Sequence, residues 1–371
     1  MTSRRTLVTA ATAALGMVLV ATALLVASQW TRRAVPLPPE HDLAVVLVSG
    51  PNRLVTVDLS EMRIVRDVPL RTMALDIAAD ASSGVVVTPQ CGGVSTDADD
   101  VIGLYDPRRD SGVDYVELPA VNPGLVAVRD GTAFVEHGLL VESGLFVSTV
   151  DLAARAVECT ATLADGPGGS LAAGDGAVYA LAVEERGTGP SALWVCALDT
   201  STLATRCATP PILGATCVAS DPASGVVVFG KPVAGAPRVG DGGWFASVRE
   251  GEPLRPVAIP GLSAADVGCV TNRWVFAGSW GGDEPTPGDS WVAWVDRRTM
   301  EAGGRIEAVG GVSGLAALGD RLVVVEHRPC RLVVVDPRTA REVASVALGY
   351  PQSLFADVVV LPGRPAGSGA R

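Results

Sequence analysis

The chain has 371 residues, of which 48% are hydrophobic and 19% are charged, and it contains 42 Gly and 26 Pro. This composition is typical of strands and turns rather than of helices, and the length allows two average domains or one large all-β domain. The net charge of −11 argues against a nucleic-acid-binding protein, because such a protein needs a basic surface to neutralise phosphates.

Residues 1–33 predict either a retained signal anchor or a cleaved signal peptide. Arg4 and Arg5 precede an uncharged run over residues 6–28, which as a helix is long enough to span a hydrocarbon core of ~30 Å. The small residues before position 29 suit signal peptidase, but the apolar part of a signal peptide usually covers only about 7–15 residues. Both alternatives place the rest of the chain outside the cytoplasm. The anchor makes it a single-pass protein of the cell membrane, held there by the N-terminal helix.

The remaining chain divides into three parts by composition. Residues 34–42 form a Pro-rich linker, which we expect to be semi-rigid. Residues 43–361 form the folded domain. Residues 362–371 are rich in Gly, Pro and Ala and predict a disordered tail.

An apolar run that ends in Asp, or once in Arg, recurs through the folded domain at spacings of 40–50 residues. This is the period of propeller blades. A polar turn follows each run, and Asp suits its start because the carboxylate accepts a hydrogen bond from the backbone two residues on. The runs end at Asp58, Asp106, Asp151, Asp199, Arg249, Asp296 and Asp336.

The order of strands predicts a closed ring of seven blades. We name the strands of a blade A to D from the inside outward. Residues 43–49 read as a B strand without a preceding A strand, and residues 353–360 read as an A strand without a following B strand. The two ends therefore complete one blade, which removes the exposed edges of an open array. We expect residues 53–59 to lie in the same sheet as residues 353–360.

The repeat resembles a known group of proteins. The segment VVVDPRTAREVASVALG at residues 333–349 is similar to the repeats of bacterial seven-bladed β-propellers of the YVTN and surface-layer type. The resemblance covers about residues 43–361 and lies in the repeat, since the Tyr-Val-Thr-Asn signature itself is absent. Quinoprotein propellers are more distant relatives, and their Trp-docking motif is not recognisable in this chain. We therefore expect no quinone and no other cofactor.

No catalytic or metal-binding residue is predicted, and the sequence favours a protein that is not an enzyme. The chain has no G-x-S-x-G, P-loop or H-E-x-x-H motif. His137 and His327 each end a Val-Glu-His triplet, which we assign to the same strand-B position in two blades that are not adjacent. This placement favours a feature of the repeat over a metal site.

The candidate ligand-binding residues lie on the face that carries the B–C loops. These loops are long in blades 1 to 5, counted along the chain from the blade that begins near residue 74. Long loops on a rigid scaffold commonly carry function. Trp280 lies in such a loop rather than at a repeated position, and an aromatic ring there can stack on a sugar or a peptide. The candidates are Trp280, Asp283, Glu284, Arg238, Asp241, Glu185, Arg186 and His327.

Seven cysteines in an exported chain predict disulfides and one odd thiol. Cys196 and Cys207 lie on consecutive C and D strands and can face each other, although Cys159, at the repeat position of Cys207 one blade earlier, competes as a partner. Cys217 and Cys269 lie on inner strands of adjacent blades and form a second plausible pair. Cys91 and Cys330 both lie in B–C loops, and their connectivity is open.

The leading hypothesis is a monomeric propeller that acts as a binding or scaffolding module for a peptide, protein or glycan. One alternative is a propeller enzyme of lyase or lactonase type with a cation at the channel mouth, which requires acids or histidines that converge on the channel. The other is a purely structural protein of the cell envelope.

Overall fold

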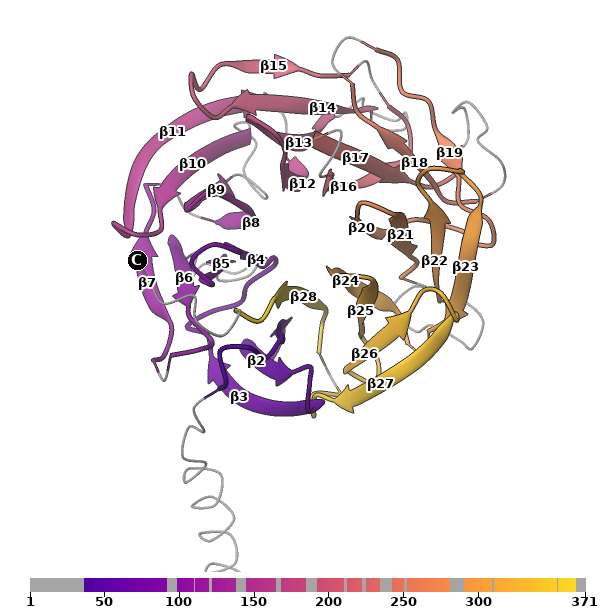
Figure 1. Ribbon diagram of the computed structural model, residues 1–371. Coiled ribbons are helices and arrows are strands. Elements are labelled where there is room, and N and C mark those ends of the chain that lie inside the picture. The colour runs from indigo at the N-terminus through magenta and orange to yellow at the C-terminus, as the bar shows by residue number, and fades with distance from the viewer. Residues whose placement is uncertain are drawn as a thin grey trace, which may run out of the picture. The chain divides into compact units, whose positions relative to one another are not determined.

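The computed structural model describes residues 37–91, 99–109, 111–119, 122–137, 145–164, 168–184, 192–209, 212–221, 225–233, 242–249, 252–280, 290–308, 310–351 and 353–364. In this part of the chain the strands form seven four-stranded antiparallel sheets around a central channel (Figure 1). The predicted all-β, seven-bladed propeller is therefore confirmed. We number blades 1 to 6 along the chain from β4, and the blade formed by the two chain ends is blade 7.

Each blade contributes one strand to each of four positions, and the strands at each position follow in order from blade 1 to blade 7. The inner A strands are β4 (Ala78–Ala79), β8 (Pro123–Arg129), β12 (Gly168–Ala173), β16 (Ala215–Asp221), β20 (Val267–Val270), β24 (Val312–Leu318) and β28 (Ala356–Leu361). The B strands are β5 (Val86–Gln90), β9 (Thr132–His137), β13 (Ala177–Glu184), β17 (Gly225–Gly230), β21 (Trp274–Gly278), β25 (Arg321–Glu326) and β1 (Leu43–Val48). The C strands are β6 (Val101–Tyr105), β10 (Leu145–Asp151), β14 (Ala192–Asp199), β18 (Trp244–Ser247), β22 (Trp291–Asp296), β26 (Arg331–Asp336) and β2 (Arg53–Asp58). The outer D strands are β7 (Asp114–Glu117), β11 (Ala156–Ala164), β15 (Thr205–Cys207), β19 (Val257–Ala258), β23 (Ala302–Glu307), β27 (Arg341–Ala347) and β3 (Arg63–Pro69).

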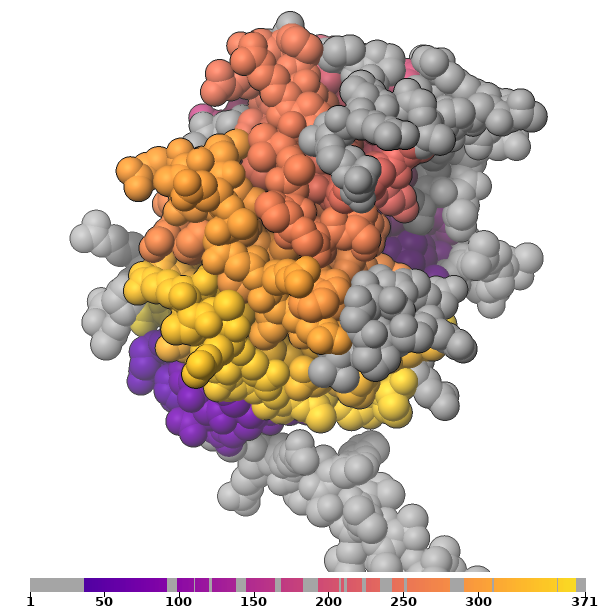
Figure 2. Space-filling model, turned by 90° about the vertical axis from the view of Figure 1, so that its right-hand side faces the viewer, coloured from indigo at the N-terminus to yellow at the C-terminus, as the bar shows by residue number. Residues whose placement is uncertain are grey.

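Blade 7 closes the ring as the sequence predicts. Its strand order is β28-β1-β2-β3, so the last strand of the chain pairs with the first. The register runs from Leu43 opposite Leu361 to Val48 opposite Ala356. Figure 2 shows the seam from the side, with the N-terminal strands of blade 7 against the C-terminal strands of blade 6. Closure leaves no open sheet edge between the two chain ends.

Residues beyond the closing strand add a second contact between the ends. The backbone N–H of Arg364 donates to the carbonyl of Pro39 (2.7 Å), and that of Gly363 donates to Asp42 Oδ1 (2.7 Å). Arg108 Nη2 donates to the carbonyls of His41 (3.2 Å) and Pro362 (3.0 Å). The two ends are thereby tied to each other and to blade 1.

The core is formed by side chains that pack between neighbouring blades. One apolar cluster, for example, joins Val55 and Val57 of blade 7 to Val323 and Val334 of blade 6. β-branched residues suit strands that are covered on both faces. Trp244, five residues before the end of its run, is 5% exposed within such a cluster.

The repeated Asp closes the turn between the C and D strands. Asp151 Oδ1 accepts from the N–H groups of Ala153 (2.7 Å) and Ala154 (2.8 Å). The same pair of bonds is made by Asp58, Asp199 and Asp296. The predicted role of this residue is confirmed, and it explains why an acidic side chain ends an otherwise apolar strand.

The cysteines are placed as follows. Cys196 and Cys207 are directly opposite each other in the β14–β15 pairing, as the sequence predicts. Cys217 on β16 and Cys269 on β20 lie in adjacent blades, and both are free thiols. Cys330 is a buried free thiol. The structure therefore does not join Cys217 to Cys269.

In the described part of the chain, none of the elements is a helix with the length and apolar character needed to cross a membrane. The predicted N-terminal helix at residues 1–33 lies outside the described residues.

Candidate functional site

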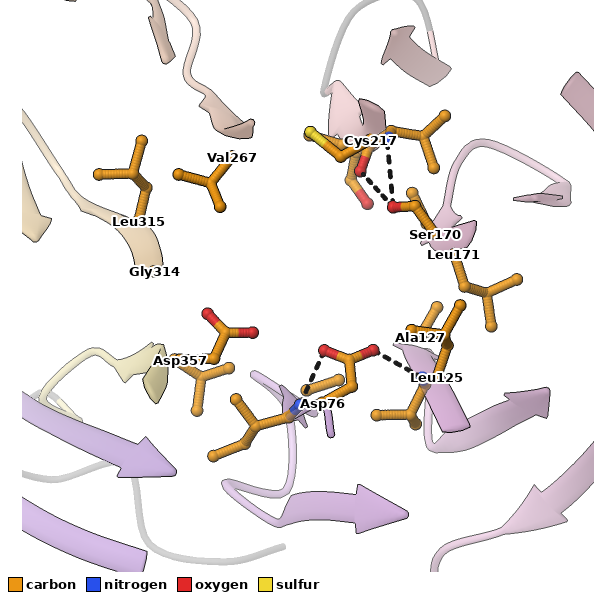
Figure 3. Close-up of a pocket in the computed structure, with 18 of the residues that line it drawn as sticks. Asp76, Leu125, Ala127, Ser170, Leu171, Cys217, Val267, Gly314, Leu315 and Asp357 are labelled. Atoms are coloured by element: carbon orange, nitrogen blue, oxygen red, sulfur yellow. Dashed lines mark hydrogen bonds between the residues drawn. The ribbon is translucent and has the colours of Figure 1, made fainter. Parts of the chain in front are cut away.

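One position of the inner segment recurs once per blade and lines the channel. The seven residues at this position, which we call the channel ring, all line a cavity of about 400 Å³. Figure 3 labels each of them around the opening. In order from blade 1 to blade 7 they are Asp76, Leu125, Ser170, Cys217, Val267, Gly314 and Asp357.

Irregular strand pairing precedes three of the ring residues. The registers of β12, β16 and β24 with their B strands shift just before Ser170, Cys217 and Gly314. An extra residue at such a shift re-aims the side chain that follows it. Asp357 lies opposite Leu47, one residue before the end of β1. The ring therefore lies at the end of the channel that faces the B–C loops.

Asp76 is held between two blades. Its Oδ1 accepts from the N–H of Ile77 (2.8 Å), and its Oδ2 accepts from the N–H of Val126 in blade 2 (2.8 Å). Ser170 makes the equivalent bond, since its Oγ accepts from the N–H of Val218 in the next blade (3.1 Å). Polar ring residues thus brace neighbouring inner strands.

Asp357 stands next to Asp76 in the ring, and Gly314 leaves room for it. Its Oδ1 accepts from the N–H of Val358 (2.7 Å). A Cβ atom at Gly314 would lie 2.7 Å from Asp357 Oδ1, so a larger residue there would displace the carboxyl group.

The two aspartates share one environment and influence each other's protonation. Burial raises the pKa of Asp76 to about 6. Burial, and then the negative charge of Asp76, raise the pKa of Asp357 well above its usual value. Asp76 accepts two backbone N–H bonds and Asp357 one, and such bonds favour the ionised form. The two groups therefore do not ionise independently, and Asp76, which accepts more backbone hydrogen bonds, is the one favoured to carry the charge.

A third carboxyl group lies behind the ring in blade 2. Glu136 on β9 is fully buried, and neither of its oxygens makes a hydrogen bond of ordinary geometry. Burial raises its pKa to about 8, the nearby backbone N–H of Leu125 opposes this rise, and the charge of Asp76 adds to it. Because Leu125 lines the cavity, Glu136 lies directly behind the cavity wall.

The two Val-Glu-His triplets do not occupy the same strand position, which corrects the interpretation from sequence. Glu136 lies opposite Val147, whereas Glu326 lies opposite Arg331. The triplets are offset by one residue relative to the C strand, and such an offset turns the side chains to the other face of the sheet. Glu326 forms an ion pair with Arg331 (2.5 Å).

Two of the eight predicted loop candidates are among the described residues, and they contact each other. The half-buried ring of Trp280 in blade 5 packs on His327 of blade 6, with 4.7 Å between ring centroids. The N–H of Trp280 also donates to Asp266 Oδ2 (2.9 Å). This pair joins two blades. The other candidates, Glu185, Arg186, Arg238, Asp241, Asp283 and Glu284, lie outside the described residues.

The channel ring was not predicted from the sequence. The available signal was that Asp stands twice at a position where the other inner segments carry Leu, Ser, Cys, Val or Gly. None of the cavity-lining residues is Lys, Arg or His. In the described part of the chain, no group of three or more His, Cys, Asp or Glu side chains is placed to hold a metal ion.

Comparison with known proteins gives the fold. No family model matches the chain, and no curated protein matches it in sequence. Apo AztD from Citrobacter koseri is similar in structure at 9% identity, with 87% of this chain and 99% of that chain covered and a TM-score of 0.59. A functionally unknown protein from Desulfotomaculum acetoxidans matches at 10% identity, with the same coverage and a TM-score of 0.60.

The dihydro-heme d1 dehydrogenase NirN, in its complex with DHE, matches at 14% identity, with 85% of this chain and 75% of that chain covered and a TM-score of 0.53. Identities this low show a common fold and nothing about ligands. By its own sheets and by these similarities, the chain is a seven-bladed β-propeller.

Proposed function

We propose that this chain is an extracytoplasmic binding module whose ligand enters the channel from the face that carries the B–C loops. The observation that supports this is the pair of aspartates, Asp76 and Asp357, side by side in a cavity of about 400 Å³. Ligand sites are commonly apolar concavities with a few convergent polar groups. The ring has this character, because its aspartates stand among Leu, Val and Ala side chains. The ligand is a group on a peptide, protein or glycan.

Filling the ring tests the proposal. Val267 lines the cavity across from the aspartates, and the structure gives it no polar contact to lose. We expect Val267→Trp in the full-length chain to abolish specific capture of envelope components, quantified by mass spectrometry against wild type. Val343→Trp is the matched control, since Val343 is 52% exposed on the outer strand β27. Equal capture by both variants contradicts binding in the channel.

The same pair supports a second candidate, the enzyme of lyase or lactonase type. Two carboxyl groups that share a proton can act as general acid and general base. Such an enzyme would lose turnover of its substrate in Asp357→Asn while retaining binding. A binding module would show no turnover of candidate lactones or uronate polymers with the wild-type protein.

Two further parts of the proposal concern location. Residues 1–33 anchor the chain in the cell membrane or direct its secretion, and the propeller faces away from the cytoplasm. Cys196 and Cys207, which are paired in register, form a disulfide there. Non-reducing peptide mapping of protein from the envelope fraction tests both statements, because the linked peptide forms only in an oxidising compartment.

A further inference from the structure

We infer that the group bound in the channel is a primary ammonium, held between the carboxyl groups of Asp76 and Asp357. The inference rests on the proposed function and names the chemistry of its ligand. The ammonium belongs either to a small amine or to a Lys side chain of a peptide, and the experiment below separates these sources.

Charge favours a cation over any other ligand. Asp76 and Asp357 face the cavity, and no basic residue lines it. Elsewhere in the chain, the buried carboxylate of Asp221 has a cationic partner in Arg297 (2.7 Å). A buried negative charge without a partner is costly. A cationic ligand removes that cost.

Glu136 is a third acidic group near this point. It comes from a B strand rather than from the ring, it is fully buried, and neither of its oxygens makes a hydrogen bond of ordinary geometry. It lies close enough to Asp76 for that charge to raise its pKa. Asp76 and Asp357 thus line the cavity with Glu136 behind its wall, and no basic side chain lines the cavity.

The geometry suits an ammonium better than a metal ion. A calcium ion needs six or more oxygen ligands, and no suitable group of three side chains is found among the described residues. Both oxygens of Asp76 already accept a backbone N–H, which leaves each with one further lone pair. An ammonium has three donors in a compact head, so it can donate to both aspartates at once.

Binding an ammonium at this point displaces a proton. The other ionisable groups near the pair are Cys217, which lines the same cavity, and Glu136 behind its wall, while Asp266 interacts electrostatically with Cys217. The thiol of Cys217 stays neutral, because burial raises its pKa to about 12. In the empty site Asp357 holds the shared proton. When R–NH₃⁺ donates to both carboxylates, Asp357 loses that proton to the solvent, so the complex forms with release of one proton.

Isothermal titration of the full-length protein at pH 7 tests the inference. The probes are cadaverine, an acetylated Gly-Lys-Gly amide, and 1-pentanol as the uncharged comparison. We expect saturable binding of at least one amine and none of 1-pentanol. We also expect the heat to differ between phosphate and HEPES buffers, neither of which is a primary amine, in proportion to proton release. The stronger of the two amines identifies the source of the ammonium.

Two variants test whether the ammonium binds at Asp357. Asp357→Asn keeps the shape of the side chain, and we expect it to weaken amine binding roughly tenfold or more, the value of a charged hydrogen bond, and to remove the difference between buffers. Asp175→Asn is the control for net charge, because Asp175 is 95% exposed. The comparison of buffers uses wild-type protein, so it decides the matter even where Asp357→Asn does not fold.

Three outcomes overturn the inference: neither amine binds, calcium chloride binds and the amines do not, or amines bind equally well to Asp357→Asn. None of these overturns the proposed function if Val267→Trp still abolishes capture of envelope components. Failure of the ammonium and failure of channel binding are therefore distinguishable.

Discussion

At the scale of the residue, one step of register decides whether a buried glutamate is paired. Glu326 lies opposite Arg331 and forms an ion pair with it. Glu136 lies opposite Val147, and neither of its oxygens makes a hydrogen bond of ordinary geometry. The same tripeptide therefore stabilises the fold in blade 6 and destabilises it in blade 2 once the carboxyl group ionises.

The first prediction concerns Glu136→Gln. The pKa of Glu136 is raised from 4.5 to about 8 in the folded protein, so the native state binds more protons than the unfolded state between these values. Stability must then fall as pH rises from about 5 to 8. We expect Glu136→Gln to flatten this decline and to exceed wild type by roughly 2–4 kcal/mol at pH 9. Urea unfolding at pH 5 and pH 9 measures it.

Glu326→Gln is the matched control and should behave in the opposite way. Its removal leaves Arg331, which is 21% exposed, with only the longer contact to Glu342 (3.4 Å). We expect a loss of roughly 1–3 kcal/mol at pH 7. Similar pH profiles for Glu136→Gln and wild type would show that Glu136 is paired in solution.

The residues of the candidate site were harder to predict than the fold. Loop length and the aromatic Trp280 predicted a site in the B–C loops, but Trp280 packs on His327 between two blades. Asp76 and Asp357 are 281 residues apart and meet only because β28 closes the ring beside blade 1. Asp76 also lies before the two-residue strand β4, outside its regular pairing, so the alternation of residues along the strand does not reveal its direction.

At the scale of the element, the turn between the C and D strands repeats a strained conformation. The fourth residue after the repeated Asp has positive φ in five blades, and in none of these is it glycine. These residues are Met62, Arg155, Leu203, Met300 and Ala340, with φ between 47° and 59°. A side chain in this region costs roughly 1–2 kcal/mol.

The second prediction is that Met300→Gly stabilises the protein. Met300 has a φ of 58° and is 47% exposed, so the substitution relieves strain and loses little packing. Glycine's greater freedom in the unfolded chain offsets part of the gain. We expect a net increase of about 0.5 kcal/mol in the free energy of unfolding, measured with urea. Arg298→Gly, in the same turn but at a residue without positive φ, should lower the free energy of unfolding. A decrease in both variants would show that Met300 is not strained.

At the scale of the whole molecule, the ring was predictable because a period of 40–50 residues and two incomplete blades leave one way to close it. The ends of the individual strands were harder to predict. The predicted inner segment at residues 74–79 contributes only the two residues of β4 to regular pairing. Side chains replace the missing ladder there, since Gln90 Oε1 accepts from the N–H of Thr72 (2.9 Å) and Asp76 accepts from two backbone groups.

The third prediction concerns closure. Removal of residues 351–371 takes away β28, which supplies all six register pairs on one side of β1 and buries Ala356 and Val358. The exposed edge of β1 is a long apolar strand, so we expect this truncation to aggregate rather than to fold. Removal of residues 365–371 alone should leave the urea midpoint unchanged, because β28 and the bond from Arg364 to Pro39 are both retained.

A peptide of residues 351–364 supplied in trans separates loss of closure from a general effect of truncation. Strand addition to an exposed sheet edge uses backbone hydrogen bonds and alternate side-chain pockets, and β1 offers both once β28 is gone. We expect the peptide, added during refolding, to restore a soluble monomer with the β-sheet circular dichroism spectrum of the full chain. A peptide with Val358→Asp should fail, because Val358 enters the core shared by blades 6 and 7. If the truncated chain is soluble and cooperative without any peptide, six blades suffice and the pairing of the chain ends is not what holds the ring together.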